Sequence, residues 1–118
     1  MPDDLSWVEQ LGASVTVTDA AGTIVAMNAS SRAGFAADGG AALVGTSVFS
    51  CHPEPALTEL RRLYETREPN HYTIRKGDRK KIIHQLPWYR EGRFAGFVEI
   101  SIPIPDELPH FDRDAKKQ

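Results

Sequence analysis

The chain has 118 residues, of which 41% are hydrophobic and 25% charged, and its formal net charge is −2. This length predicts a single domain, and the charge argues against nucleic-acid binding, which requires a basic face. No stretch approaches the roughly 20 apolar residues of a membrane span. The acidic start Met1-Pro2-Asp3-Asp4 is unlike a secretory leader, and the single cysteine fits a reducing compartment. We therefore expect a cytoplasmic protein.

Hydrophobic spacing and turn residues predict the elements in chain order. Leu5, Val8 and Leu11 stand at helical spacing near the N-terminus. Val15 and Val17 alternate with polar residues, as in a half-buried strand. The expected elements are a helix within 1–12, strands over 14–18 and 23–27, short helices over 29–36 and 41–44, a long helix over 53–67, and strands over 71–75, 79–89 and 94–102.

The order of these elements predicts the fold class. The long helix is expected to begin at Pro53, because a proline in the first turn leaves no backbone N–H unpaired. A hairpin, short helices, this helix and three further strands predict an α+β domain with a five-stranded antiparallel sheet and helices on one face. We expect an N-terminal capping and dimerisation helix (1–12), the domain itself (13–104) and a polar C-terminal tail (105–118).

Four short motifs follow one another along the chain: Asp19-Ala20-Ala21-Gly22-Thr23-Ile24 with Asn28, Leu43-Val44-Gly45, His52-Pro53, and Gly92 with Gly96. In this order they resemble the motifs of PAS sensor domains, and the resemblance covers residues 13–103. The stretch Cys51-His52-Pro53-Glu54-Pro55 is similar to a subgroup of small bacterial PAS proteins.

The resemblance implies a sensory or signalling module that has no catalysis of its own and passes its signal to a separate output protein. Such a module binds a small ligand between sheet and helices, forms a homodimer, or does both. The alternative is that the same residues fill a closed core, because protein interiors are densely packed. Strand alternation predicts that the pocket is lined by Phe35, Leu57, Leu60, Tyr64, Tyr72, Ile74, His84, Leu86, Trp88, Val98 and Ile100.

A second hypothesis is a haem- or redox-dependent sensor built on Cys51 and His52. Both side chains can ligate haem iron, and some PAS domains bind haem through a histidine on the long helix. A histidine before proline also serves simply to open that helix. The paired ligand spacings of a zinc site are absent from the sequence, so no metal site is expected.

A third hypothesis is a small α+β enzyme with a site formed by His84 and Tyr72. His71 and His84 belong to neighbouring predicted strands, where they can face each other as a pH-sensitive pair.

The other sheet face is expected to form a homodimer interface, because an open apolar face requires a cover. The N-terminal helix would supply this cover in its own subunit or in a partner. The predicted interface consists of Leu5, Trp7, Val8, Leu11, Val25, Met27, Ile83 and Phe97.

Overall fold

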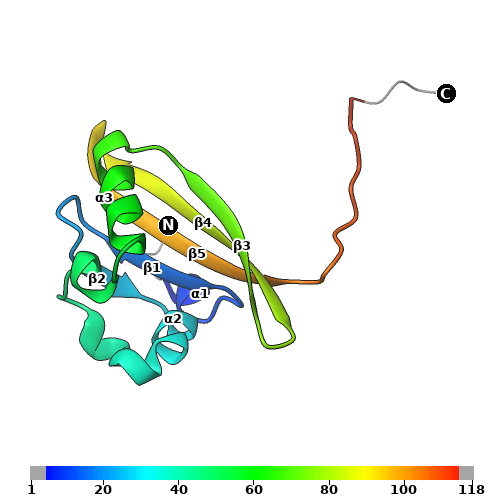
Figure 1. Ribbon diagram of the computed structural model, residues 1–118, viewed down its shortest axis with the longest axis horizontal. Coiled ribbons are helices and arrows are strands. Elements are labelled where there is room, and N and C mark those ends of the chain that lie inside the picture. Colours follow the sequence, from blue (N-terminus) through cyan, green and yellow to red (C-terminus); the bar gives the residue numbers. More distant parts are fainter. Residues whose placement is uncertain (1–4, 115–118) are drawn as a thin grey trace.

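The fold is a five-stranded antiparallel sheet with helices packed against one face (Figure 1). The computed structural model describes residues 5–114. The strands lie in the order β2-β1-β5-β4-β3, so the N-terminal hairpin joins the C-terminal strands where β1 pairs with β5. The predicted α+β class and sheet are confirmed. The elements are α1 (Ser6–Glu9), β1 (Ser14–Thr18), β2 (Ile24–Met27), α2 (Ala29–Gly34), η1 (Ala36–Asp38), η2 (Gly40–Leu43), η3 (Val48–Cys51), α3 (Ala56–Thr66), β3 (Asn70–Lys76), β4 (Arg79–Arg90) and β5 (Arg93–Ile104).

The sheet has an inner face, against which α3 packs, and an outer face turned away from α3 (Figure 1). Cross-strand partners share a face, so the pairing register assigns each strand residue. Phe97 of β5 is only 5% exposed and its ring packs on Tyr64 of α3, so it faces inward. The next residue, Val98, therefore lies on the outer face with its partners Val17 and Leu86. The core beneath the helices includes Ile24, Met27, Leu63, Ile83 and Phe97.

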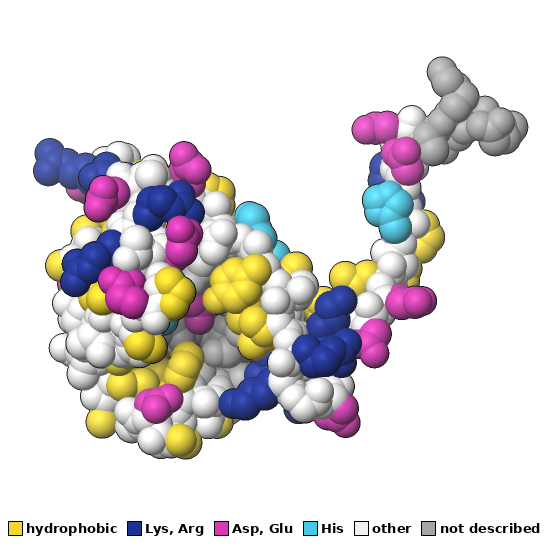
Figure 2. Space-filling model, in the orientation of Figure 1, with side chains coloured by type: hydrophobic (Ala, Val, Ile, Leu, Met, Phe, Trp, Pro, Cys, Tyr) yellow, Lys and Arg dark blue, Asp and Glu magenta, His cyan; other side chains and the backbone are white. Residues whose placement is uncertain are grey.

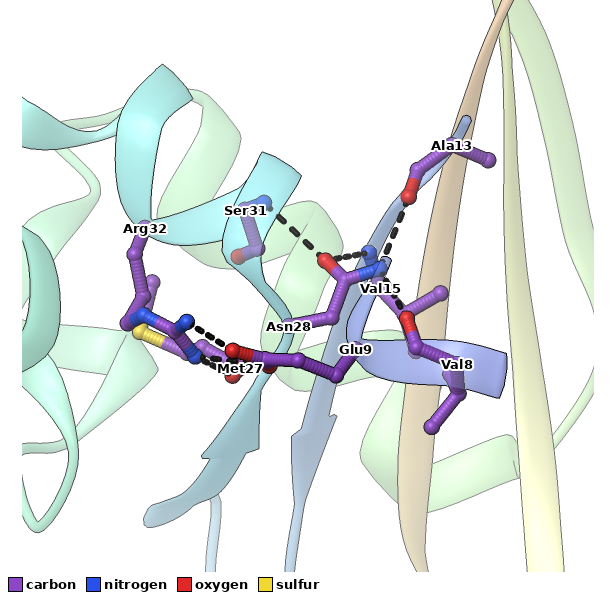
Figure 3. Close-up of polar contacts among 8 residues, drawn as sticks. All are labelled: Val8, Glu9, Ala13, Val15, Met27, Asn28, Ser31 and Arg32. Atoms are coloured by element: carbon purple, nitrogen blue, oxygen red, sulfur yellow. Dashed lines mark hydrogen bonds and ion pairs between the residues drawn. The ribbon is translucent and has the colours of Figure 1, made fainter. Parts of the chain in front are cut away.

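Asn28 joins several chain segments at the end of β2 (Figure 3). Its side-chain oxygen accepts hydrogen bonds from the backbone N–H groups of Val15 and Ser31, both at 3.0 Å. Its side-chain NH₂ group donates to the carbonyl oxygens of Val8 at 2.8 Å and Ala13 at 2.9 Å. Asn28 thus caps α2, as asparagine does at helix N-termini, and fixes α1 and β1 to the same point.

The N-terminal helix is shorter than predicted. It covers only Ser6–Glu9, so Leu11 lies beyond it. Arg32 of α2 pairs with the Glu9 carboxylate, and its guanidinium also donates to the Met27 carbonyl at 2.6 Å. The hydrogen bond from Arg32 holds the pKa of Glu9 below its ordinary value. Residues 1–4 of the predicted helix lie outside the described residues.

The long helix begins at Ala56, three residues later than predicted, so Pro53 does not start it. Glu54 lies just before the helix, and its carboxylate accepts hydrogen bonds from the Thr58 N–H at 2.9 Å and hydroxyl at 2.6 Å. These bonds lower the pKa of Glu54. Negative charge at this end is also favoured by the helix dipole. None of the described helices is long and apolar enough to cross a membrane.

The segment that follows β5 runs away from the sheet as an extended chain (Figure 1). Asp106 pairs with Arg75 of β3 at its start, and this contact lowers the pKa of Asp106. Leu108 and Phe111 are exposed further along, so the predicted polar tail carries apolar side chains. Its last residues, 115–118, lie outside the described part of the chain.

Candidate ligand-binding cavity

A cavity of about 370 Å³ lies between the inner sheet face and the helices. Figure 2 shows this side of the molecule, where hydrophobic side chains gather over the middle of the face. The wall combines an apolar majority with a few polar groups, which is the usual composition of a small-molecule site. It is lined by Thr16, Thr18, Ile24, Met27, Phe35, Asp38, Leu43, Val48, Cys51, His52, Leu60, Leu63, Tyr64, Gln85, Phe97 and Glu99.

Tyr64 of α3 organises one end of the cavity. Its ring makes an edge contact with Phe49 at 5.0 Å between centroids and a tilted contact with Phe97 at 4.8 Å. Its hydroxyl shares a 2.5 Å hydrogen bond with the Thr18 hydroxyl, which also accepts the Phe97 N–H at 3.2 Å. Burial is the main cause that raises the pKa of Tyr64, so the phenol stays neutral and able to donate near neutral pH.

The floor of the cavity is polar. Thr16 of β1 hydrogen-bonds through its hydroxyl to Ser31 of α2, at 2.6 Å. Glu99 pairs across the sheet with both Thr16 and Gln85, so these three residues form a row on the inner face. Among the described residues no buried side-chain nitrogen or oxygen lacks a hydrogen-bond partner.

His52 and Cys51 lie in the cavity wall at exposed positions. The His52 Nδ1 is 2.7 Å from the Val48 carbonyl oxygen, so Nδ1 carries the proton and Nε2 is the nitrogen left as a ligand or acceptor. The Cys51 sulfur is 3.6 Å from the Ser47 carbonyl oxygen. Within residues 5–114 no group of three His, Cys, Asp or Glu side chains is placed to hold a metal ion.

The cavity wall contains three of the four pocket residues predicted from the helix side and none of those predicted from the sheet. Phe35, Leu60 and Tyr64 line the cavity, but Leu57 does not. Tyr72 and Ile74 lie on the inner face, because they pair across the sheet with Ile83 and Lys81. They do not line the cavity. The residues that lie on the outer face instead are His84, Leu86, Trp88, Val98 and Ile100.

Three residues of the predicted dimer interface lie on the inner face of the sheet and not on the outer face. Met27 and Phe97 line the cavity and Ile83 is buried on the inner face, so none of the three is available to a partner. Leu5, Trp7, Leu11 and Val25 are exposed, with Trp7 64% accessible. Val8 is partly buried beside Asn28.

The structure separates the two residues of the third hypothesis, the His84–Tyr72 site. Tyr72 pairs with Ile83, so it lies on the inner face, whereas His84 lies on the outer face. The predicted contact between His71 and His84 is confirmed, with 2.8 Å between their Nδ1 atoms. That bond requires one ring to donate and the other to accept, so the two Nδ1 atoms share one proton.

Sequence reasoning missed the polar residues of the cavity, namely Thr16, Thr18, Asp38, Gln85 and Glu99. Glu99 stands between Val98 and Ile100 in β5, and this charged residue in an apolar stretch was the available signal. The signal could not be interpreted further from the sequence, because it does not show which residues pair across the sheet. Only the β4–β5 register places Gln85 opposite Glu99 and so indicates a polar cavity floor.

A family model described as PAS fold matches residues 8–107. The chain belongs to the PAS-fold family. Comparison with the curated proteins finds no match. The solved structures described below are at most 20% identical to this chain. They therefore support the fold and not a particular ligand.

Three solved structures illustrate the range of proteins that this PAS domain is similar to. The Aer2 receptor of Vibrio cholerae, described as a dual PAS-Heme oxygen sensor, is 20% identical, with 79% of this chain and 95% of that chain covered and a TM-score of 0.61. VqmA of Vibrio cholerae is 18% identical, with 90% and 53% covered and a TM-score of 0.65. The PAS domain of nitrogen regulation protein NR(II) from Vibrio parahaemolyticus is 12% identical, with 84% and 95% covered and a TM-score of 0.57. At these levels of identity, the three structures support the PAS fold of this chain.

Proposed function

We propose that this PAS domain is a sensory module that binds a small organic ligand in the cavity between its sheet and helices. The observation that carries the proposal is an apolar cavity of about 370 Å³ with a few convergent polar groups, because such sites are typical of small-molecule binding. VqmA has also been solved bound to DPO. The domain would act without catalysis and report to a separate output protein.

The signal would leave the cavity through the elements that form its wall. Thr18 and Phe97 line the cavity and belong to β1 and β5, and β5 continues directly into the extended C-terminal segment. Asn28 ties β1 to α1 and α2. A ligand that binds one packing of these elements better than another shifts their equilibrium, and a partner protein reads the change.

The outer sheet face favours homodimerisation as part of this function. It presents partly exposed aliphatic side chains from three strands, β1, β4 and β5, and α1, with four residues, is only about 6 Å long. A helix of this length cannot cover the face, whereas a second copy of the chain can, together with the exposed Leu5 and Trp7. The apolar residues of the outer face are Val15, Val17, Ile82, Leu86, Val98, Ile100 and Ile102.

Replacing Ile100 with glutamate is expected to convert a homodimer into a folded monomer. Ile100 lies between Val15 and His84 near the middle of the outer face, so a charge there would be desolvated in the dimer but hydrated in the monomer. Sedimentation velocity at micromolar concentration measures the change. Ala33→Glu, which adds the same charge at an exposed position of α2, should remain dimeric. A monomeric wild-type protein, or a dimeric I100E protein, would contradict the proposed interface.

The haem alternative rests on His52, whose Nε2 is the free ring nitrogen in the cavity wall. The lining residues fit haem poorly, however. Haem carries two propionate groups, whereas the charged side chains that residues 5–114 place in the wall are Asp38 and Glu99, with no lysine or arginine among them. Like charges in a partly buried site repel, so we favour an uncharged or cationic organic ligand.

A visible spectrum and a native mass spectrum, before and after addition of haemin, separate these alternatives. We expect a colourless protein that carries an extra organic mass and shows no haem band that depends on His52. His52→Ala should leave that mass in place, as should the control His71→Ala, whose ring lies on the outer face. A haem band lost in His52→Ala but retained in His71→Ala would overturn the organic-ligand proposal. A protein with nothing bound would leave a purely protein-binding module as the better account.

A further inference from the structure

A polar row crosses the inner sheet face and ends in the cavity. Asn70 of β3 pairs with Gln85 of β4, which pairs with Glu99 of β5. The Asn70 side chain donates to the Gln85 side-chain oxygen at 2.8 Å, and the Gln85 NH₂ group donates to the Glu99 carboxylate at 3.0 Å. Both amides therefore donate in one direction, toward Glu99.

The Glu99 carboxylate keeps unused acceptor capacity inside the cavity. A carboxylate offers about four lone-pair positions, and Gln85 occupies one of them. In the described part of the chain, residues 5–114, no lysine or arginine side chain forms an ion pair with Glu99. A partly buried carboxylate without a cation is unfavourable, so a ligand that supplies one gains affinity at this point.

The rest of the wall has the same charge preference. Among the described residues, Asp38 is the other charged residue that lines the cavity, and no lysine or arginine lines it. Burial is the main cause of the raised pKa of Tyr64 and Tyr72, and the nearby negative charge of Glu99 raises both further. The aliphatic and aromatic side chains of the wall, among them Ile24 and Phe97, accommodate an apolar body.

Building on the proposed ligand-binding function, we propose that the cavity selects a small apolar molecule that carries a protonated amine and that it discriminates against anions. The amine donates to the Glu99 carboxylate, and the body of the ligand packs against the aliphatic and aromatic wall. A charge-assisted hydrogen bond of this kind is roughly twice as strong as a neutral one, which makes it the main source of selectivity in a cavity of about 370 Å³.

Four probes of nearly equal size test the proposal: benzylamine, benzyl alcohol, toluene and benzoate. They share one ring and differ in the charge and donor capacity of the substituent. We expect benzylamine to bind at least about tenfold more tightly than toluene, benzyl alcohol to lie between them, and benzoate to bind most weakly. Shifts of backbone amide signals in two-dimensional NMR spectra report the affinity of each probe and show that it binds in the cavity.

Glu99→Gln should remove most of the amine's advantage, to within about threefold of toluene, and leave toluene affinity unchanged. The substituted side chain keeps an oxygen that can accept from Gln85, so we expect the variant to fold. Glu107→Gln removes the same charge from an exposed position after β5 and should bind all four probes like the wild type.

The outcomes separate this inference from the proposed function on which it rests. If toluene binds in the cavity but benzylamine is not preferred, or if E99Q keeps the preference, charge selection is wrong and ligand binding stands. If none of the four probes shifts amide signals of the cavity in the wild-type protein, the ligand-binding function itself fails. The wild-type probe series tests ligand binding and the preference for the amine, and E99Q tests whether Glu99 is the source of that preference.

Discussion

Replacing Asn28 with alanine is expected to lower the free energy of unfolding by about 3 kcal/mol or more. Asn28 is 5% exposed, and its side chain makes four hydrogen bonds to backbone groups of separate segments (Figure 3). Alanine removes all four and leaves buried backbone groups unsatisfied, each at a cost of about 1–3 kcal/mol when water cannot reach it. Urea unfolding followed by circular dichroism measures the loss.

Two further variants identify the cause of that loss. Asn28→Asp keeps an oxygen toward Val15 and Ser31 but turns a second carboxylate oxygen toward two carbonyl oxygens, so we expect it to be destabilised at neutral pH as well. Ser30→Ala alters an exposed position on the same helix and should change stability by no more than about 0.5 kcal/mol. If N28A unfolded at the wild-type urea concentration, the network would not contribute to stability.

The sequence was sufficient to predict the order and type of the strands because their signals are local. Apolar alternation and the Gly-containing turns place all five strands to within a few residues of their observed bounds. The start of the long helix was misplaced for a local reason as well. Pro53 can begin a helix, but the observed helix starts at Ala56, and the Glu54 carboxylate accepts hydrogen bonds from Thr58 in its first turn.

An irregularity in the pairing of β4 with β5 leaves no clear mark in the sequence. The pairing of β4 with β5 shifts between Trp88 and Tyr89, so Trp88 is opposite Gly96 while Tyr89 is opposite Phe94. Phe94 and Phe97 consequently both contact Tyr64, although strict alternation puts residues three apart on opposite faces. A one-residue shift of this kind moves every later side chain to the other face.

The inner and outer faces of β4 and β5 were exchanged in the prediction because the outer face is the more hydrophobic of the two. On β5 the outer set of Val98, Ile100 and Ile102 is more uniformly apolar than the inner set that contains Glu99 and Ser101. The rule that the more apolar face is the buried one fails here because the inner face borders a cavity with a polar floor. The proposed homodimer would explain the apolar outer face.

Replacing Gly96 with alanine is expected to destabilise the domain by at least about 3 kcal/mol. A Cβ atom at this position would lie 2.0 Å from the Thr18 carbonyl oxygen and 2.7 Å from backbone atoms of Asp19. Its φ of +138° is also a conformation that residues with side chains rarely adopt. Because the obstruction is backbone, no side-chain rotation relieves it, and β1 must move away from β5. Thermal unfolding measured by calorimetry checks the size of the effect.

The Gly96→Ala substitution is also expected to affect the cavity, because it displaces Thr18, which lines the cavity. The Thr18 carbonyl also accepts the Trp88 indole N–H at 2.9 Å, and the Thr18 hydroxyl bonds to Tyr64 in the cavity wall. Moving Thr18 therefore disturbs both sheet faces at once, and G96A should weaken probe binding even at temperatures where it stays folded. Gly12→Ala provides the matched control, because a Cβ there meets nothing within 4 Å. Unfolding of G96A at the same temperature as G12A, with unchanged probe affinity, would show that β1 and β5 tolerate separation and that the cavity does not depend on their close approach.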